Sequence, residues 1–219
     1  MNWFRRDIFS LSGIQHFIKW YARADNWHEL DSRTGNIGYG WIHYSLIRLA
    51  QPERVLVIGS RYGFIPAICA LGCKHNHKGI VDFVDAGYDQ QNHNDRRRHW
   101  GGVGFWTSVN LKQHFGSFGL HKRIRLYVAT SEHFYSKNPT RTWNYIYLDG
   151  DHSYDGIKED FSRYWPRLQK GGFLSIHDIR VKSLGGFDYG VWRLWSELKR
   201  QHKRTIELPG KYGLGVIQK

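Results

Sequence analysis

Acidic side chains and an imidazole gather in one short stretch of this sequence. Residues 145–161 read YIYLDGDHSYDGIKEDF, which starts as apolar alternation and then places four polar groups within seven positions: Asp149, Asp151, His152 and Asp155. Carboxylates can hold a divalent cation, and an imidazole can move a proton near neutral pH. The alternative is a solvated turn that caps the next helix. We predict that Asp151 and Asp155 belong to that turn and cap, and that Ser153 starts the helix.

A second predicted strand end brings another acid to the same place. The segment GGFLSIHDI ends on His177 and Asp178. Ligands of open α/β sheets bind outside the carboxyl ends of the strands, so we expect Asp149 and Asp178 to lie within about 5 Å of each other. We predict that these two carboxylates bind a divalent cation such as Mg²⁺. Asp149 and His152 are our candidate catalytic residues, with His152 as the general base.

A glycine turn and a further acid indicate a nucleoside-containing cofactor. The stretch VIGSRYG places Gly59 and Gly63 around a turn from a strand to a helix, where the backbone can approach a ligand closely. A purely structural turn is the alternative interpretation. Asp85 ends the next predicted strand about 20 residues further on, where an acid can bind ribose hydroxyls. Asp82 lies inside that strand and is less suited to the role.

Alternating strands and helices must position these residues. We predict helices over 8–21, 41–50, 64–72, 107–120, 157–168 and 189–203, and strands over 54–58, 79–89, 123–129, 143–149 and 171–179, with a closing hairpin over 204–217. Such alternation is typical of a parallel sheet wrapped in helices. We expect a single domain over 1–219, with a helical cap at 1–50 and a Rossmann-like core at 51–219.

Composition limits the partners and the location. The chain has 219 residues, 41% of them apolar, and 32 Lys+Arg against 19 Asp+Glu give a formal charge of +13. This charge favours anionic partners such as nucleic acid, nucleotide-linked substrates, acidic glycans or a membrane surface. Cys69 and Cys73 are too few for a disulfide framework or a zinc site. We see no secretory signal and no run of about 20 apolar residues, so we expect a cytoplasmic protein.

Several motifs together resemble a known family. VLVIGSRYGFIPAICA, VDFVDAGYD, YIYLDGDHSYDGIKEDFSRYWPRLQKGGFLSIHDI and GVWRLWSELK…GLGVI resemble, in order and spacing, the class I S-adenosylmethionine-dependent methyltransferases. The branch with the signature D-G-x-H-x-Y, which includes metal-dependent sugar O-methyltransferases, is the most similar. The resemblance covers residues 54–217. It implies a seven-stranded, mostly parallel sheet with an antiparallel C-terminal hairpin and helices on both faces.

The resemblance also implies roles for individual residues. The methionine part of the cofactor would lie at the glycine loop, its ribose at Asp85, and its adenine near the end of the third strand. The implied cofactor-binding residues are Gly59, Ser60, Arg61, Gly63, Asp85, Ala86, Thr130, Ser131 and Asp149. Asp149 and Asp178 resemble the metal ligands, and His152 occupies the place of the base. The chain departs from the family pattern at three places: Val57, Arg61 and the pair Ala129-Thr130.

We therefore expect an S-adenosylmethionine-dependent O-methyltransferase, assisted by Mg²⁺ or a similar cation. Its acceptor would be a hydroxyl of a sugar or related small molecule, with a phosphate-linked carrier as one option. The loop over 88–106 and the N-terminal helices would cover the site. An RNA methyltransferase, suggested by the charge, is an alternative. So is a non-catalytic binding module on the same fold, suggested by Val57 and Arg61. The sequence leaves open the acceptor, the metal and homo-oligomer formation.

Overall fold

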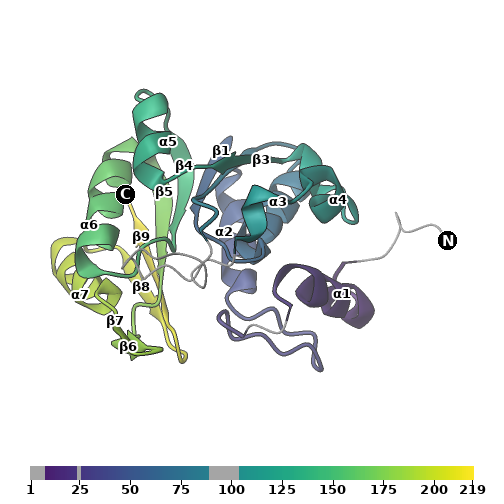
Figure 1. The fold of residues 1–219 in the computed structure, drawn as a ribbon, viewed down its shortest axis with the longest axis horizontal. Coiled ribbons are helices and arrows are strands. Elements are labelled where there is room, and N and C mark those ends of the chain that lie inside the picture. Colours follow the sequence, from purple (N-terminus) through teal and green to yellow (C-terminus); the bar gives the residue numbers. More distant parts are fainter. Residues whose placement is uncertain (1–7, 24–25, 89–103) are drawn as a thin grey trace.

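One mixed sheet of seven strands forms the centre of the computed structural model, which describes residues 8–23, 26–88 and 104–219 (Figure 1). The strands are β1 (Arg54–Ile58), β2 (Ile80–Asp85), β3 (Ile124–Val128), β4 (Trp143–Leu148), β5 (Leu168–His177), β8 (Thr205–Leu208) and β9 (Leu214–Gln218). Their order across the sheet is β3-β2-β1-β4-β5-β9-β8. Strands β1 to β5 run parallel, and β9 is antiparallel to both β5 and β8. This arrangement confirms the predicted sheet.

Helices cover both faces of this sheet. Figure 1 shows α5, α6 and α7 on one side and α2 and α3 on the other. The α-helices are α1 (Leu11–Tyr21), α2 (Gly40–Ala50), α3 (Phe64–His75), α4 (Leu111–Gly116), α5 (Ser131–Lys137), α6 (Tyr154–Tyr164) and α7 (Val191–Gln201). Short 3-10 turns are η2 (Phe105–Thr107), η3 (Leu120–Lys122) and η4 (Trp165–Arg167), and a small hairpin pairs β6 (Ser183–Leu184) with β7 (Phe187–Asp188).

Several local features differ from the predicted elements. The helix predicted over 107–120 is only the six-residue α4, and the strand predicted over 79–89 ends at Asp85. Strand β5 begins at Leu168, three residues before the predicted start, because Leu168 is buried and pairs with Trp143 before a register shift. The sequence analysis missed α5 because it has only seven residues and buries only Phe134, which is too little for a periodic pattern. It also missed the hairpin of β6 and β7. The helix predicted over 157–168 begins earlier, at Tyr154, and ends at Tyr164, because η4 with Pro166 follows.

The strands separate two hydrophobic cores, because successive side chains point to opposite faces of a sheet. In β1, Val55 and Val57 belong to the core that contains α2 and α3, whereas Leu56 and Ile58 belong to the core that contains α6 and α7. All four side chains are buried. Burial on both faces is what the continuous apolar run of a central parallel strand indicates.

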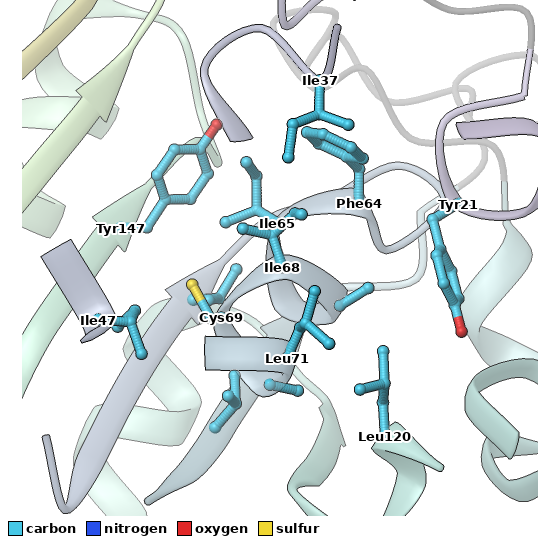
Figure 2. Packing of buried hydrophobic residues seen from close by; sticks show 14 of the residues in the cluster. Tyr21, Ile37, Ile47, Phe64, Ile65, Ile68, Cys69, Leu71, Leu120 and Tyr147 are labelled. Atoms are coloured by element: carbon cyan, nitrogen blue, oxygen red, sulfur yellow. The ribbon is translucent and has the colours of Figure 1, made fainter. Parts of the chain in front are cut away.

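Helix α3 follows the predicted glycine turn and is buried on nearly all sides (Figure 2). Ten of its twelve residues are buried, among them Cys69 and Cys73, which are both free thiols. Its approach to α2 depends on Gly72, since a Cβ there would lie 2.6 Å from Ile47. A helix packed this closely cannot slide without opening cavities, so the turn at its start is held firmly at the edge of the sheet.

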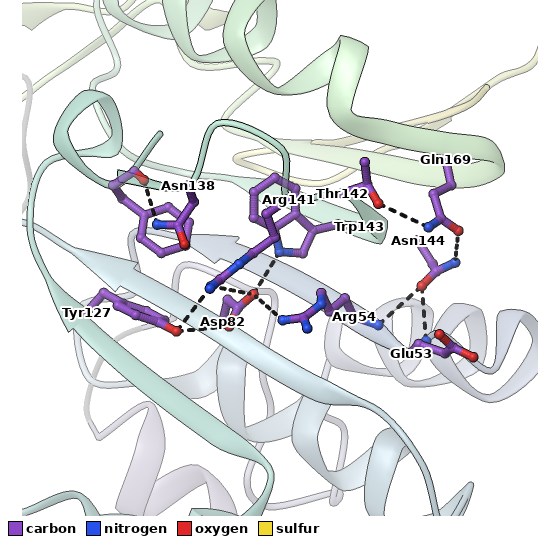
Figure 3. Close-up of polar contacts among 11 residues, drawn as sticks. Glu53, Arg54, Asp82, Tyr127, Asn138, Arg141, Thr142, Trp143, Asn144 and Gln169 are labelled. Atoms are coloured by element: carbon purple, nitrogen blue, oxygen red, sulfur yellow. Dashed lines mark hydrogen bonds and ion pairs between the residues drawn. The ribbon is translucent and has the colours of Figure 1, made fainter. Parts of the chain in front are cut away.

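A buried carboxylate links four neighbouring strands (Figure 3). Asp82 in β2 is fully buried. It accepts hydrogen bonds from Trp143 Nε1 in β4 at 2.9 Å and from the Tyr127 hydroxyl in β3 at 3.4 Å. Arg54 in β1 and Arg141 lie 3.7 and 3.4 Å from its Oδ2. Asp82 therefore stabilises the sheet and, as expected, stands apart from the predicted cofactor residues.

Helices α1 and α2 pack against the α3 side. Helix α1 begins after Ser10, whose side chain accepts a hydrogen bond from Gly13 N at 3.1 Å. Phe17 packs edge-on against Phe64 of α3. Within the described ranges, none of the helices is long and apolar enough to cross a membrane. The division at residue 50 and the cytoplasmic location stay predictions.

Candidate active site

The carboxyl ends of β1, β2, β4 and β5 open into a cavity of about 1050 Å³. Parallel strands end at one edge, and the loops that leave them form the walls. The predicted site residues that line this cavity are Gly59, Ser60, Arg61, Asp85, Ala86, Thr130, Ser131, Asp149, His152 and Asp178. Gly63 is not among the lining residues. The structure thus places the glycine turn, Asp85 and the side chains of Asp149, His152 and Asp178 around one cavity.

Three side chains form a tight group at one part of the cavity. His152 Nε2 lies 3.3 Å from Asp149 Oδ1 and 3.2 Å from Asp178 Oδ2. One potential ligand atom from each of the three residues lies within 4.8 Å of the others. Asp178 Oδ1 is buried and lies 3.1 Å from His177 Nδ1, whereas Asp178 Oδ2 faces His152. Carboxylate oxygens and an imidazole nitrogen that converge on one point fit a bound cation.

The backbone fixes the positions of these groups. Asp149 N donates to Ile58 O at 2.9 Å, which continues the pairing of β1 and β4 past the end of the strands. Asp178 has a φ of 59°, a left-handed conformation that costs free energy for a residue with a Cβ. The Ser153 side chain caps α6, and Asp151 accepts from Ser153 N at 2.8 Å. The predicted turn and cap roles of these two residues are confirmed.

A second histidine, which the sequence analysis left without a role, lies against both carboxylates. His177 Nδ1 is 3.6 Å from Asp149 Oδ1 and 3.1 Å from Asp178 Oδ1, and its Nε2 contacts Trp27 O at 2.9 Å. Burial alone would lower the pKa of His177, but the two carboxylates outweigh it and hold the pKa well above its usual value. Tyr147, the other unpredicted contact, donates to Asp149 Oδ2 at 2.9 Å. Both residues lie in strands, where the sequence pattern indicates only core.

The glycine turn and Asp85 form the adjoining part of the cavity. Gly59 has a φ of 74°, and a Cβ there would lie 2.0 Å from Asp149 O, so a larger residue does not fit. Asp85 accepts hydrogen bonds from Ser60 N at 3.2 Å and from Gly87 N at 2.9 Å. Burial raises the pKa of Asp85 to about 6, although these N–H groups oppose the shift. The acid at the end of β2 is thus oriented toward the turn that follows β1.

Gly63 serves packing rather than the cavity wall. It precedes α3 with a φ of 90°, and a Cβ there would lie 2.9 Å from the Trp106 ring. Trp106 in turn donates from Nε1 to Ser60 O at 2.9 Å, so it supports the glycine turn from behind. Trp106 ends the loop over 88–106. Residues 89–103 lie outside the described residues, so the role of this loop in covering the site stays a prediction.

Aromatic residues that the sequence analysis missed line another wall. Trp27 and His28 come from the segment between α1 and α2, and Phe187 and Tyr189 come from the β6–β7 hairpin and its exit. Flat, apolar rings of this kind can stack on a ring-shaped ligand. The only signals in the sequence are the segments NWHEL and LGGFDYG, in which aromatic residues accompany turn residues.

The same hairpin holds His152 in place. The Tyr189 ring stacks on the His152 ring with centroids 4.7 Å apart and planes 19° apart. Gly190 N donates to His152 O at 2.8 Å. This contact requires glycine, because a Cβ at Gly190 would lie 2.2 Å from Tyr154 N. The stacked Tyr189 ring and the hydrogen bond from Gly190 N to the His152 carbonyl therefore hold His152 in place.

The cavity lining is acidic although the chain is basic. Seven carboxylates line it: Asp85, Glu132, Asp149, Asp151, Glu159, Asp160 and Asp178. Among the residues that the structure describes, the arginines in the lining are Arg61 and Arg163. Such a wall favours ligands that carry positive charge or hydrogen-bond donors.

Known proteins share this fold. The O-methyltransferase TomG from Streptomyces achromogenes, solved with S-adenosylmethionine (SAM), is 15% identical, with a TM-score of 0.62 over 99% of this chain and 92% of that one. The O-methyltransferase from Bacillus cereus, solved with S-adenosylhomocysteine (SAH), is 14% identical, with a TM-score of 0.61 over 95% and 91%. In sequence, the chain is 23% identical over 190 residues to the uncharacterized protein y4gI of Sinorhizobium fredii. That match covers 87% of this chain and 20% of y4gI.

The sheet order and the cavity at its carboxyl edge define the fold that these methyltransferases share. Residues 56–179, more than half of the chain, match the family described as "Methyltransferase domain". The chain belongs to that family.

Proposed function

We propose that this chain is an O-methyltransferase that is assisted by a divalent cation and acts on a hydroxyl of a sugar or related small molecule. The observation that carries the proposal is the group formed by Asp149, His152 and Asp178, whose potential ligand atoms converge in the same cavity as the glycine turn. Two structural neighbours are described as O-methyltransferases, which supports an oxygen acceptor.

Asp149 and Asp178 would hold the cation, since both present carboxylate oxygens to one point. A hard divalent cation supplies Lewis-acid polarisation, which lowers the pKa of a bound hydroxyl. Tyr147 supports this arrangement by donating to the second oxygen of Asp149, which leaves Oδ1 directed to the shared point. The donor set therefore fits a cation that prefers oxygen ligands.

His152 would take the proton of the acceptor hydroxyl. In that step the O–H bond breaks and the proton moves to His152 Nε2. The oxygen forms a bond to the methyl carbon of SAM, the bond from that carbon to sulfur breaks, and sulfur keeps the electron pair as the neutral thioether of SAH. Most of the rate would come from holding the oxygen about 3–3.5 Å from the methyl group. Tyr189 would help by fixing the plane of the imidazole.

His152 has a second candidate role as a third cation ligand, because its Nε2 is equally close to both carboxylates. The two roles predict different results for His152→Ala. Loss of a base lowers the rate and leaves cation affinity unchanged. Loss of a ligand weakens cation affinity about 10-fold or more.

The acidic and aromatic lining favours a small acceptor over RNA. A polyanion would meet seven carboxylates in the cavity, whereas a sugar ring could stack on Trp27, Phe187 or Tyr189. The remaining alternative is a binding module without activity. Calorimetry with SAM separates it from both enzyme candidates, since no binding at millimolar SAM would contradict every methyltransferase reading of this cavity.

The test needs no knowledge of the acceptor. We expect the purified chain to bind Mn²⁺, followed by loss of the free-ion EPR signal, and Asp178→Asn to weaken this binding at least about 10-fold because it removes one of two anionic ligands. Asp155→Asn, an exposed aspartate on the next helix, is the control and should bind Mn²⁺ like the wild type. Equal Mn²⁺ binding by all three proteins would contradict the cation proposal. Transfer of radiolabelled methyl groups to a panel of free and nucleotide-linked sugars then tests the acceptor.

A further inference from the structure

A buried carboxylate that the proposed chemistry does not use also lines the cavity. Asp160 on α6 is only 3% exposed. Its Oδ1 accepts a hydrogen bond from the Ser131 hydroxyl at 2.5 Å and lies 3.5 Å from Arg163 Nη1. Its Oδ2 has no hydrogen-bond or ion-pair partner among the residues described. Asp160 is therefore a buried acceptor with one oxygen satisfied by the protein and one oxygen available to a ligand.

Asp160 lines the cavity, so a ligand bound there would displace water from its Oδ2. An acceptor that loses its water is unfavourable unless the ligand satisfies it, and the loss is larger for a charged group. Burial raises the pKa of Asp160 to about 6, with Ser131 and Arg163 opposing the shift. At pH 7.5 the carboxyl group is still mostly ionised and acts as an acceptor. The ligand that meets Oδ2 should therefore be a hydrogen-bond donor.

The position of Asp160 identifies which part of the cofactor it meets. A Cβ on Gly150, directly after Asp149, would lie 3.3 Å from Asp160 Oδ2, so this oxygen lies over the turn that leaves β4. Ser131 brings the loop after β3 to the same point. If the ribose binds at Asp85 and the adenine near Ser131, as the resemblance implies, the base would reach this place between α5 and α6.

Other polar groups at this end are already occupied. The Thr130 side chain accepts from His133 N at 3.1 Å and caps α5. Glu159 pairs with Arg163 at 2.7 Å, and its side chain is 63% exposed. Asp160 thus differs from its neighbours in being both buried and incompletely paired.

We propose that Asp160 Oδ2 accepts a hydrogen bond from the exocyclic amino group of the cofactor's adenine and so selects adenine over hypoxanthine. Adenine presents an amino donor at position 6, whereas hypoxanthine presents a carbonyl acceptor there. A carboxylate facing that carbonyl would leave two acceptors opposed, which is a strong basis for rejection. The inference rests on the SAM dependence in the proposed function and not on the cation or the acceptor hydroxyl.

Binding calorimetry at pH 7.5 with SAH and S-inosyl-L-homocysteine tests the proposal. We expect the wild type to bind SAH about 30-fold or more tightly than the inosyl analogue, in line with a hydrogen bond to a charged group. Asp160→Asn keeps the shape of the side chain and adds an amino donor that can face the carbonyl. We expect its preference to fall below about 5-fold. The matched control is Asp155→Asn, an exposed aspartate on the same helix that does not line the cavity, and it should keep the wild-type preference.

A second variant tests the proposal even if Asp160→Asn does not fold. Ser131→Ala removes the hydroxyl that orients Asp160 but leaves the carboxylate in place, so the preference should fall about 3-fold. Equal binding of both ligands by the wild type, or an unchanged preference in Asp160→Asn or in Ser131→Ala, would overturn the proposal. If the wild type binds neither ligand at millimolar concentration, the cofactor assignment itself fails, which is a distinct result.

Discussion

At the residue scale, burial decides the charge of His43. The ring lies in α2 and is fully buried. Its Nδ1 is 2.5 Å from the Tyr145 hydroxyl, and its Nε2 has no hydrogen-bond partner within the described ranges. Burial, with a smaller contribution from His177, lowers the pKa of His43 to about 3, against a raising effect of Asp149. The ring is therefore neutral in the folded chain at every pH at which the protein would be handled.

This pKa predicts a loss of stability in mild acid. The unfolded His43 binds a proton below about pH 6.5 and the folded residue does so only near pH 3, so the free energy of unfolding falls as the pH drops through this window. Between pH 6.5 and 4.5 we expect the wild type to lose about 2–3 kcal/mol more than His43→Asn, which does not titrate. Urea unfolding followed by tryptophan fluorescence at several pH values measures the difference. Parallel pH curves for the two proteins would show that His43 is not the titrating group.

At the element scale, the polar contacts of Asp82 hold adjacent strands in register. The carboxylate in β2 contacts Tyr127 of β3, Arg54 of β1 and Trp143 of β4 (Figure 3). Those strands carry Asp85 and Asp149 at their ends, so their relative heights set the geometry of the cavity. A buried charge of this kind is strongly destabilising to break, because its partners are then left without a counter-charge.

The substitution Asp82→Asn removes that charge and measures its contribution to stability. The amide keeps the size of the side chain and can still accept from Trp143, but Arg54 and Arg141 lose their counter-ion. Since both arginines are partly exposed, we expect a cost of about 2 kcal/mol, below that of a fully buried pair. Glu132→Gln, which alters an exposed pair with Arg163, should change stability by less than about 0.5 kcal/mol. Urea unfolding measures the free energy of unfolding of both variants. Equal changes in the two variants would show that the buried charge of Asp82 adds no more stability than the exposed pair.

At the scale of the whole molecule, charge is unevenly distributed. The chain carries a formal charge of +13, yet the described lining of the cavity has seven carboxylates and two arginines. The positive excess must therefore lie outside the cavity. Polyanions attracted by it would meet the outer surface, whereas the cofactor enters an acidic space.

This distribution predicts that RNA and the cofactor bind independently. Single-stranded RNA should bind at low ionic strength and dissociate steeply as salt rises toward 0.3 M, because few specific contacts support it. SAH affinity should be the same with and without saturating RNA. Fluorescence anisotropy of labelled RNA and calorimetry of SAH measure the two. Competition between RNA and SAH would instead favour the RNA methyltransferase alternative.

Local sequence patterns predicted most of the sheet and part of the site. The apolar run over 54–58, the acid at Asp85 and the cluster around Asp149 each lie at a strand end, so their common edge followed from the rule for parallel sheets. Patterns failed where the information was not local. The pattern indicated correctly that His177 lies in a strand, but it gave no sign of its contacts with the two carboxylates. Helix α5 was too short to show a helical period. Phe187 and Tyr189 lie in a hairpin of two-residue strands, which carries almost no periodic signal.

The sequence by itself determined the order of the longer elements, the closing hairpin and the residues placed at the strand ends, because hydrophobic period and turn residues act over short distances. Only the tertiary structure decided how these residues are used. It paired Asp160 with Ser131, stacked Tyr189 on His152 and placed Gly63 behind the cavity wall. Such contacts join segments far apart in the chain. They depend on packing distances and burial, which no local pattern encodes.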